Sequence, residues 1–145
     1  MGYVESTLLK DEHAVFKTSL HWIIFVPSIV FLVIAGVLYY GGASSVGNVV
    51  LLIALVLGVT EYGVYKNSEF AVTNKRVVIK IGILRRRTLE TLLQKIEAIA
   101  VEQGISARIF GFGTIVVIGT GGTKEPFKRI RAPMEFRRAV QSESS

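Results

Sequence analysis

The sequence has no cysteine, which excludes disulfide bonds, thiolate metal sites and a catalytic thiol. It has only two histidines, His13 and His21. A zinc site would depend on these two side chains and on carboxylates, so we expect no metal. Both histidines precede residue 22, and no pattern brings a serine, a histidine and an acid together as a hydrolase requires. These absences argue against an enzyme, and we expect no cofactor.

Acidic residues are outnumbered by basic residues in the second half of the chain. Residues 66–145 carry 15 Lys and Arg against seven Glu, whereas residues 1–65 carry two Lys against four acids. A basic domain tethered beside a bilayer is attracted to anionic headgroups. The same charge also fits the ordinary positive-inside bias of membrane proteins. Charge alone therefore leaves open whether the basic face is functional.

Charged residues are almost missing from two long apolar runs. Residues 22–40 contain none, and residues 46–65 contain only Glu61. Each run is close to the roughly 20 residues that cross the hydrocarbon core of a bilayer. Trp22 begins the first run and Tyr65 ends the second, as expected of aromatic residues at a membrane boundary. The two runs predict a transmembrane helical hairpin over residues 22–65.

The connection between the two runs predicts the orientation of the hairpin. It comprises residues 41–45 and carries no charge. Such a short connection makes the helices antiparallel and places both outer ends on one side of the membrane. Lys66, Lys75 and Arg76 follow the second run, so the positive-inside rule predicts that both termini are cytoplasmic. A signal peptide is not favoured, because the leader before residue 22 is long and mixed in charge.

Small residues predict where the two helices of the hairpin pack. Short side chains let helix backbones approach closely inside a membrane. Ala35 and Gly36 form a flat patch on the first helix, and Ala54 and Gly58 form a small-xxx-small pair on the second. These residues fit a seam within the hairpin, or a contact with a partner protein.

Glu61 is the one ionisable residue inside either run. An intramembrane carboxylate is a functional candidate by default, as in transporters and channels. A plainer interpretation is an interfacial acid, since Glu61 lies near the cytoplasmic end of its run. It would then extend to the interface or pair with Lys66 or His21.

Strand-forming residues follow the second run. We predict strands over residues 69–73, 76–81, 83–93, 96–102, 114–118 and 127–131. Residues 106–113 predict a tight connecting turn, and residues 119–123 a glycine-rich one. Pro133 opens a predicted helix over residues 134–141. This order predicts a small barrel or curved antiparallel sheet with a C-terminal helix.

The leader has the composition of a further strand over residues 13–20. We hypothesise that it pairs with the later strands, so that the hairpin is an insertion between two strands of one sheet. The predicted organisation is a cytoplasmic leader at 1–21, the hairpin at 22–65, a cytoplasmic domain at 66–141 and a disordered tail at 142–145.

Three segments of the second half carry a resemblance to a known family. They are Thr73-Asn74-Lys75-Arg76, Leu93-Gln94-Lys95-Ile96-Glu97-Ala98-Ile99 and Arg108-Ile109-Phe110-Gly111-Phe112-Gly113-Thr114. With the two preceding spans, the chain resembles the bacterial pleckstrin-homology (PH)-like, membrane-flanked domain family over nearly its whole length. The resemblance implies a PH-like β-barrel with a C-terminal helix, at the bacterial inner membrane. It implies no reaction, because fold alone does not establish function.

Basic residues supply the candidate binding site. They are Arg85, Arg86, Arg87, Lys124, Lys128, Arg129 and Arg131. If they face the bilayer, they could hold phosphate headgroups or an acidic protein partner. The alternative is a solvated basic face that only follows membrane topology. Nucleic acid is not favoured, because no aromatic residue interrupts the Arg run to stack on bases.

These observations favour a non-enzymatic inner-membrane protein with a cytoplasmic binding module. The leading hypothesis is a scaffold that binds a membrane protein partner or self-associates. The second is a reader of anionic lipid headgroups through the Arg85–Arg87 cluster. The third is a small transport or channel subunit that depends on Glu61. The glycine-rich pieces at 111–113 and 119–122 lack the setting of a nucleotide site.

Overall fold

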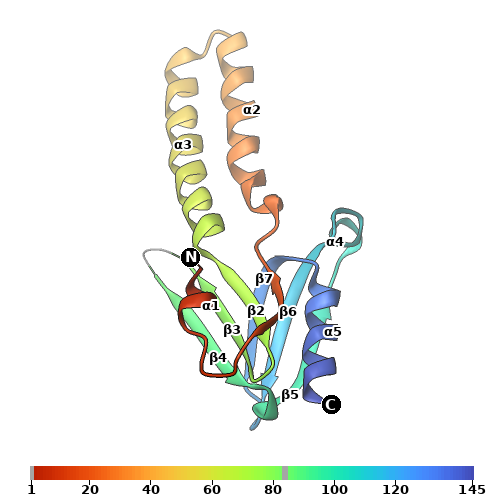
Figure 1. Cartoon of the computed structure of the whole chain (residues 1–145). Helices are drawn as coiled ribbons and strands as arrows, with labels where there is room; N and C mark the ends of the chain where they lie inside the picture. Colours follow the sequence, from red (N-terminus) through yellow and green to blue (C-terminus); the bar gives the residue numbers. More distant parts are fainter. Residues whose placement is uncertain (1, 83–84) are drawn as a thin grey trace. The chain divides into compact units, whose positions relative to one another are not determined.

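A computed structural model of the chain describes residues 2–82 and 85–145 (Figure 1). These residues form two compact units. One is the helical hairpin, Trp22–Lys66, and the other combines the segments that flank the hairpin in sequence. We call this second unit the β-domain.

Two antiparallel helices make up the hairpin. A 3-10 turn, η1 (Trp22–Phe25), leads into α2 (Val26–Tyr40), and α3 (Ser44–Asn67) returns. Pro27 lies in the first turn of α2, where the N–H that proline lacks would have had no helical acceptor. Both helices are long and apolar enough to cross a membrane. The predicted hairpin is therefore confirmed, with α3 two residues longer at each end than predicted.

Small side chains form the seam between α2 and α3. Ala35 and Ala54 are each only 2% exposed. A Cβ atom on Gly58 would lie 3.8 Å from the Cβ atom of Ser28. Gly36, in contrast, is exposed and has nothing near it, because one residue along a helix turns the side chain by about 100°. The seam within the hairpin therefore includes the two alanines and Gly58, and Gly36 lies outside it.

In the described part of the β-domain, seven antiparallel strands form two sheets. The four-stranded sheet has the order β1 (Ala14–Thr18), β2 (Glu69–Thr73), β3 (Arg76–Ile81), β4 (Arg87–Leu92). The three-stranded sheet has the order β5 (Ile96–Glu102), β6 (Phe112–Gly119), β7 (Lys124–Arg131). A 3-10 turn, η2 (Leu93–Lys95), connects them. Together with the C-terminal helix α5 (Pro133–Ser144), this arrangement is consistent with a PH-like fold, as the resemblance implied.

The leader joins both sheets of the β-domain. β1 pairs with β2, with Phe16 opposite Val72, so the hairpin is inserted between two neighbouring strands. Beyond β1, Leu20 forms a β-bridge with Ile130 of β7. The N–H of His21 donates to the carbonyl of Arg129 at 2.8 Å. The chain before the hairpin therefore closes the side of the β-domain between β2 and β7.

Aromatic residues fill the core between the sheets and α5. Phe70 of β2 and Phe127 of β7 meet edge to face, with ring centroids 6.4 Å apart. Phe136 of α5 packs in the same way on Phe16 of β1. Phe70, Phe127 and Phe136 are at most 1% exposed. Truncating one such ring to alanine typically costs about 3–5 kcal/mol of stability, so α5 is an integral part of the fold.

A short helix, α4 (Ile105–Phe110), replaces the predicted tight turn between β5 and β6. The prediction gave too much weight to the glycines that bound this segment. Gly104 and Gly111 are the two ends of a helical turn, and Gly111 has the left-handed φ of 80° that ends many helices. Its N–H donates to the carbonyl of Ala107 at 2.9 Å.

Several element ends also differ from the prediction; β6, for example, is longer than the predicted 114–118. Residues 142–144 are helical rather than disordered, because Ser142 and Ser144 donate hydroxyl hydrogen bonds to carbonyls of the preceding turn. β7 begins at Lys124 rather than Phe127, since Pro126 is tolerated on an edge strand. The predicted strand over 83–93 corresponds to β4, but β4 begins only at Arg87, and Leu93 belongs to η2; residues 83 and 84 lie outside the described residues.

Candidate functional site

A buried ion-pair network holds the leader on the β-domain. Nε of Arg76 donates to Oε1 of Glu12 at 2.9 Å, and its Nη1 donates to Oε2 of Glu90 at 2.5 Å. Its Nη2 donates to the carbonyl of Thr7 at 2.6 Å. Thr73 donates its hydroxyl to Oε1 of Glu12 at 2.7 Å. The donors of Arg76 are thus used within the fold, which makes this network structural.

The charges of this network stabilise each other. Burial opposes ionisation of Glu12, yet hydrogen bonds from Arg76, the Leu9 backbone and Thr73 outweigh it and lower the pKa of Glu12. The hydrogen bond to Glu12 raises the pKa of Arg76. Glu90 is exposed on β4, and its carboxylate accepts from Arg76 and from the hydroxyl of Tyr3.

The three predicted arginines have different environments. Arg85 and Arg86 are exposed in the β3–β4 connection. Arg87 forms an ion pair with Glu125 of β7, and its guanidinium lies 5.2 Å from the centroid of the Phe127 ring. Arg87 therefore links the two sheets, while Arg85 and Arg86 remain available at the surface.

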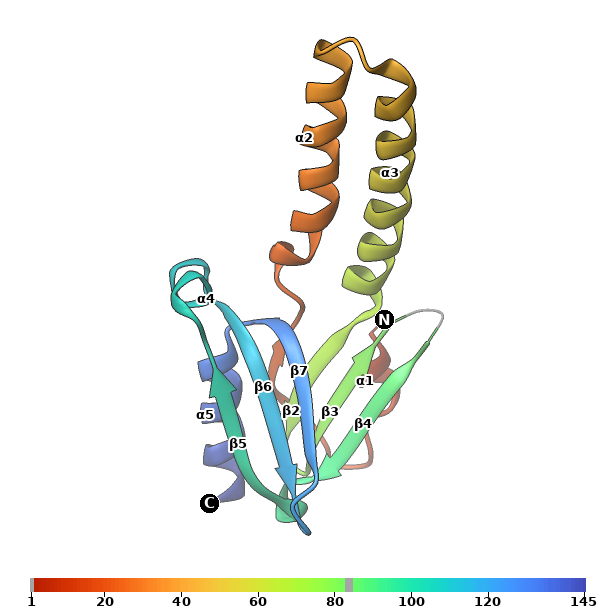
Figure 2. The ribbon, with the colours of Figure 1, turned by 180° about the vertical axis from the view of Figure 1, so that it is seen from behind.

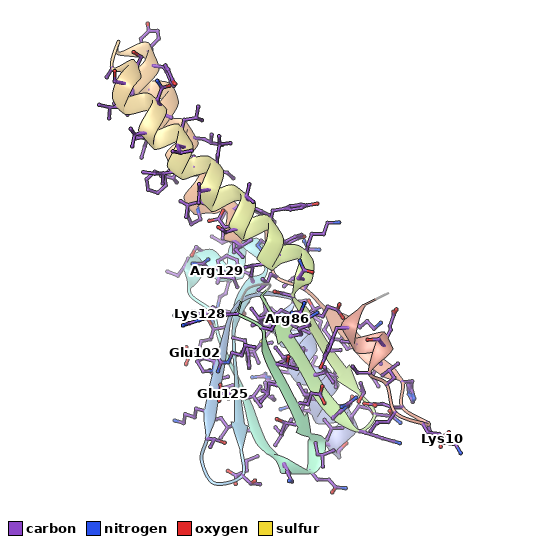
Figure 3. All side chains as sticks on the ribbon, turned by 90° about the vertical axis from the view of Figure 1, so that its left-hand side faces the viewer. Lys10, Arg86, Glu102, Glu125, Lys128 and Arg129 are labelled. Carbon is purple, nitrogen blue, oxygen red and sulfur yellow. The ribbon has the colours of Figure 1, made fainter. Side chains whose placement is uncertain are left out.

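The other four predicted residues extend along β7. Lys124 begins the strand and Arg131 ends it. At about 3.3 Å per residue, the ends of this strand are roughly 20 Å apart, so they do not form one cluster. Lys128 and Arg129 lie in a bulge opposite β6, and Arg129 has the left-handed φ of 60°. Figure 3 shows Arg86, Lys128 and Arg129 in one half of the β-domain and Lys10 at its opposite end.

Glu61 of α3 has one buried carboxylate oxygen, Oε2, without a hydrogen-bond partner in the described structure. The ion pair with Lys66 that the sequence suggested is not present among the described residues. The ammonium of Lys66 instead lies 5.9 Å from the centroid of the Tyr62 ring.

His21 is buried in the β-domain beside α4. Its ring centroid lies 5.2 Å from that of Phe112, and its imidazole is hydrogen-bonded to the Phe110 backbone. Burial lowers the pKa of His21, and the charge of Arg131 lowers it further, against the effect of the Phe110 hydrogen bond. In the part of the chain that the structure describes, no three His, Asp or Glu side chains gather as metal ligands.

An open groove of about 930 Å³ lies where β5 ends beside the first turns of α5. Arg108 of α4 and Arg137 of α5 line it, together with Gln103 and Met134. Nε of Arg137 is buried, and it has no hydrogen-bond partner among the described residues. Such a donor is costly to leave unsatisfied, which marks this groove as a candidate binding site.

The outer edge of β5 runs beside the same groove. Within residues 2–82 and 85–145, β5 pairs only with β6 and is the edge strand of its sheet. Figure 2 shows β5 outermost in the sheet, with α5 next to it. Alternate N–H and C=O groups of an edge strand point away from the sheet and can pair with another strand. We call this edge and the groove the β5–α5 surface.

The sequence alone did not identify the β5–α5 surface. Arg108 lay within a segment interpreted as a turn, and Arg137 lay within the predicted C-terminal helix, where no pattern singled it out. The sequence feature that could have indicated this site is the position of Arg137, one residue after the buried Phe136. That position puts the arginine at the margin of the packed face rather than opposite it.

The family comparison agrees with the architecture. A family model for the bacterial PH domain matches residues 22–144, which include the hairpin as well as the strands and α5. No curated protein and no solved structure is significantly similar to the chain.

Proposed function

Because the chain belongs to the bacterial PH domain family, we propose that it is a membrane-anchored, non-enzymatic docking module. The hairpin spans a bacterial inner membrane, with both termini in the cytoplasm. The β5–α5 surface binds an extended, acidic segment of a partner protein. The observation that carries this proposal is the unpaired edge of β5 beside a groove with two arginines.

The surface of the hairpin supports its placement in a membrane. Only 17% of the first span and 11% of the second are buried, which is unlike the core helices of a soluble protein. Exposed apolar side chains such as Val33, Val37, Leu52 and Val59 cover it, each more than 60% exposed. Transferring such side chains from water to hydrocarbon is favourable by about 1.5–3 kcal/mol each. Lys66 in the last turn of α3, with Lys75 and Arg76 after it, supports a cytoplasmic β-domain.

The geometry of β5 supports recognition of an extended segment. Peptides add to exposed sheet edges through backbone hydrogen bonds, which give affinity, while neighbouring pockets for side chains give specificity. α5 provides the wall of such a pocket, with Met134 as its apolar lining and Arg137 as its polar lining. An extended strand is therefore the backbone geometry that this surface accepts.

The charge of the groove supports an acidic partner. A carboxylate in the groove would accept from Nε of Arg137, which is otherwise unsatisfied, and would be attracted to Arg108. Glu102, also in the groove, disfavours a second acid at its end of β5. The partner segment thus carries one acidic side chain opposite α5, flanked by residues that tolerate an extended backbone.

A photo-crosslinking amino acid at Ala98, exposed on β5, tests the proposal in native membranes. We expect a discrete heterologous adduct that Arg137→Gln reduces at least tenfold and that Arg138→Gln, an exposed neighbour on α5, leaves unchanged. The same probe at Thr88, exposed on β4, should give no such adduct. An adduct of twice the chain's mass would show self-association instead. Adducts that are insensitive to Arg137→Gln would contradict docking at this surface.

Two alternative functions are each supported by one specific observation. Arg85 and Arg86 are exposed, as a reader of anionic headgroups requires. Replacing both with alanine would then reduce binding to anionic lipids and leave the Ala98 adduct intact. Glu61 retains a buried oxygen without a partner, as a transport site requires. Glu61→Gln would change function only under that third alternative.

A further inference from the structure

Among the described residues of the β-domain, the two most exposed large apolar side chains are on α4. Ile105 is 83% exposed, Ile109 is 74% exposed and Phe110 is 50% exposed. Ile105 and Ile109 are four residues apart and share one face of the helix. Ala107 is 6% exposed and anchors the other face of α4 to the domain. A soluble surface rarely displays such side chains together unless they contact another apolar phase.

The surroundings of α4 hold it in a fixed position. Gly111 ends α4 with a hydrogen bond to Ala107, and the N–H of Ala132 donates to the carbonyl of Gly111 at 3.3 Å. The side-chain amide of Gln103 donates to the carbonyl of Phe112 at 2.8 Å. The apolar face of α4 is therefore displayed by a structured element, not by a loose loop.

The segment of the β-domain that contacts α4 leads directly into the hairpin. His21 contacts the Phe112 ring and is hydrogen-bonded to the Phe110 backbone. The next residue, Trp22, is the first of the hairpin. The chain therefore leaves the β-domain for the first span one residue after its contact with the end of α4.

Two arginines of β7 lie beside the segment that leads from β1 into the hairpin. The carbonyl of Arg129 accepts from the N–H of His21, and the N–H of Arg131 donates to the carbonyl of Ser19 at 3.0 Å. The side chains of both arginines are exposed. Apolar side chains beside a set of cations are typical of elements that lie in the interface of an anionic membrane.

We infer that α4 is an interfacial membrane-binding helix. Ile105, Ile109 and Phe110 insert into the boundary between headgroups and acyl chains of the bilayer that the hairpin crosses. Arg129 and Arg131 lie against anionic headgroups at the same level. This inference rests on the proposed membrane span of the hairpin, and it adds a second attachment that fixes the orientation of the β-domain on the membrane.

The absence of native cysteine allows a direct test with single labels on the full-length protein. The protein is reconstituted in nanodiscs of phosphatidylcholine and phosphatidylglycerol that contain lipids with a spin label in the acyl chain. A fluorophore is attached at Ile109→Cys, at Leu9→Cys or at Leu52→Cys. Leu9 is 56% exposed in the leader of the β-domain, and Leu52 is 62% exposed on α3.

We expect the labels at residues 52 and 109 to be quenched by the spin-labelled lipid, and the label at residue 9 to be at least fivefold less quenched. Strong quenching at residue 52, together with quenching at residue 109 as weak as that at residue 9, would contradict membrane insertion of α4 and leave the proposed span intact. Weak quenching at residue 52 would overturn the proposed span itself. The two failures are therefore distinguishable.

A charged residue in the apolar face provides the matched perturbation. Ile105→Asp should reduce quenching of the label at residue 109 to the level of residue 9, because a carboxylate is expelled from the acyl boundary. Leu9→Asp, a matched control, should leave it unchanged. Quenching at residue 109 that is insensitive to Ile105→Asp would contradict insertion. Equal quenching with and without phosphatidylglycerol would remove the role of Arg129 and Arg131.

Discussion

Two partly buried arginines of the β-domain have opposite environments. Arg76 donates to Glu12, Glu90 and the Thr7 carbonyl. Arg137, in the groove beside β5, has a buried Nε without a partner in the described structure. An arginine that satisfies its donors inside the fold contributes to stability, whereas one with an unsatisfied donor is available to a ligand. The comparison separates residues that fold this protein from residues that can recognise another molecule.

Removing Arg76 should have the largest effect. Arg76→Met leaves the carboxylate of Glu12, whose side chain is 0% exposed, without its cation. Removing one partner of a buried ion pair typically costs about 3–5 kcal/mol of stability. For a domain of this size, that cost corresponds to a fall of about 10 °C or more in the unfolding midpoint. Thermal unfolding of the full chain in nanodiscs measures it. Adding Glu12→Gln should recover part of the loss, and no recovery would contradict an electrostatic cause.

Acid should weaken the same network. The pKa of Glu12 is lower in the folded protein than its ordinary value of 4.5. Its contribution to stability is therefore complete above about pH 4.5 and is lost as the pH falls through the folded pKa. The unfolding midpoint measured against pH should decline less steeply below pH 4.5 in Glu12→Gln than in wild type. Parallel curves would show that other groups dominate.

Removing Arg137 should have a small effect on stability and a large one on binding. Arg137→Gln deletes a donor that makes no hydrogen bond, so the free energy of unfolding should change by less than about 1 kcal/mol. The yield of the adduct from the probe at Ala98 should fall at least tenfold. A variant that loses stability as Arg76→Met does would show that Arg137 belongs to the fold rather than to a binding site.

Removing an exposed ion pair should have the smallest effect on stability. Lys17 and Glu5 meet at 2.6 Å, but their side chains are 45% and 51% exposed. Water and salt screen such a pair, and ordering two long side chains offsets the attraction. Glu5→Gln should therefore give no measurable change in the unfolding midpoint at physiological salt. A clear fall would mean that the leader depends on this pair as well as on Arg76.

Local sequence patterns predicted the helices and strands in which apolar residues recur at regular spacing. The two apolar runs gave α2 and α3 because a helix in lipid needs apolar residues on every side. The alternating segments gave the strands, and residues 13–20 gave β1. The patterns failed at α4, where two glycines marked the ends of a helix and not a turn. They also gave no indication of the hydrogen-bond partners of Glu90, which come from residues 3 and 76.

The candidate binding residues show the same limit. The sequence drew attention to Arg85, Arg86 and Arg87 because they are adjacent, yet Arg87 is used in an ion pair between the sheets. Arg108 and Arg137 are 29 positions apart and have no common pattern, but the fold brings both to one groove. A site built from distant residues leaves no periodic signal for sequence reasoning to detect.

The sequence by itself determined the hairpin, the class of the β-domain and the absence of cysteine chemistry, because each depends on composition or on short-range periodicity. Only the tertiary structure decided which charges are satisfied and which are not. That distinction depends on distances between residues far apart in the chain, such as Glu12 and Arg76, and on burial, which removes the water that would otherwise pair with every polar group.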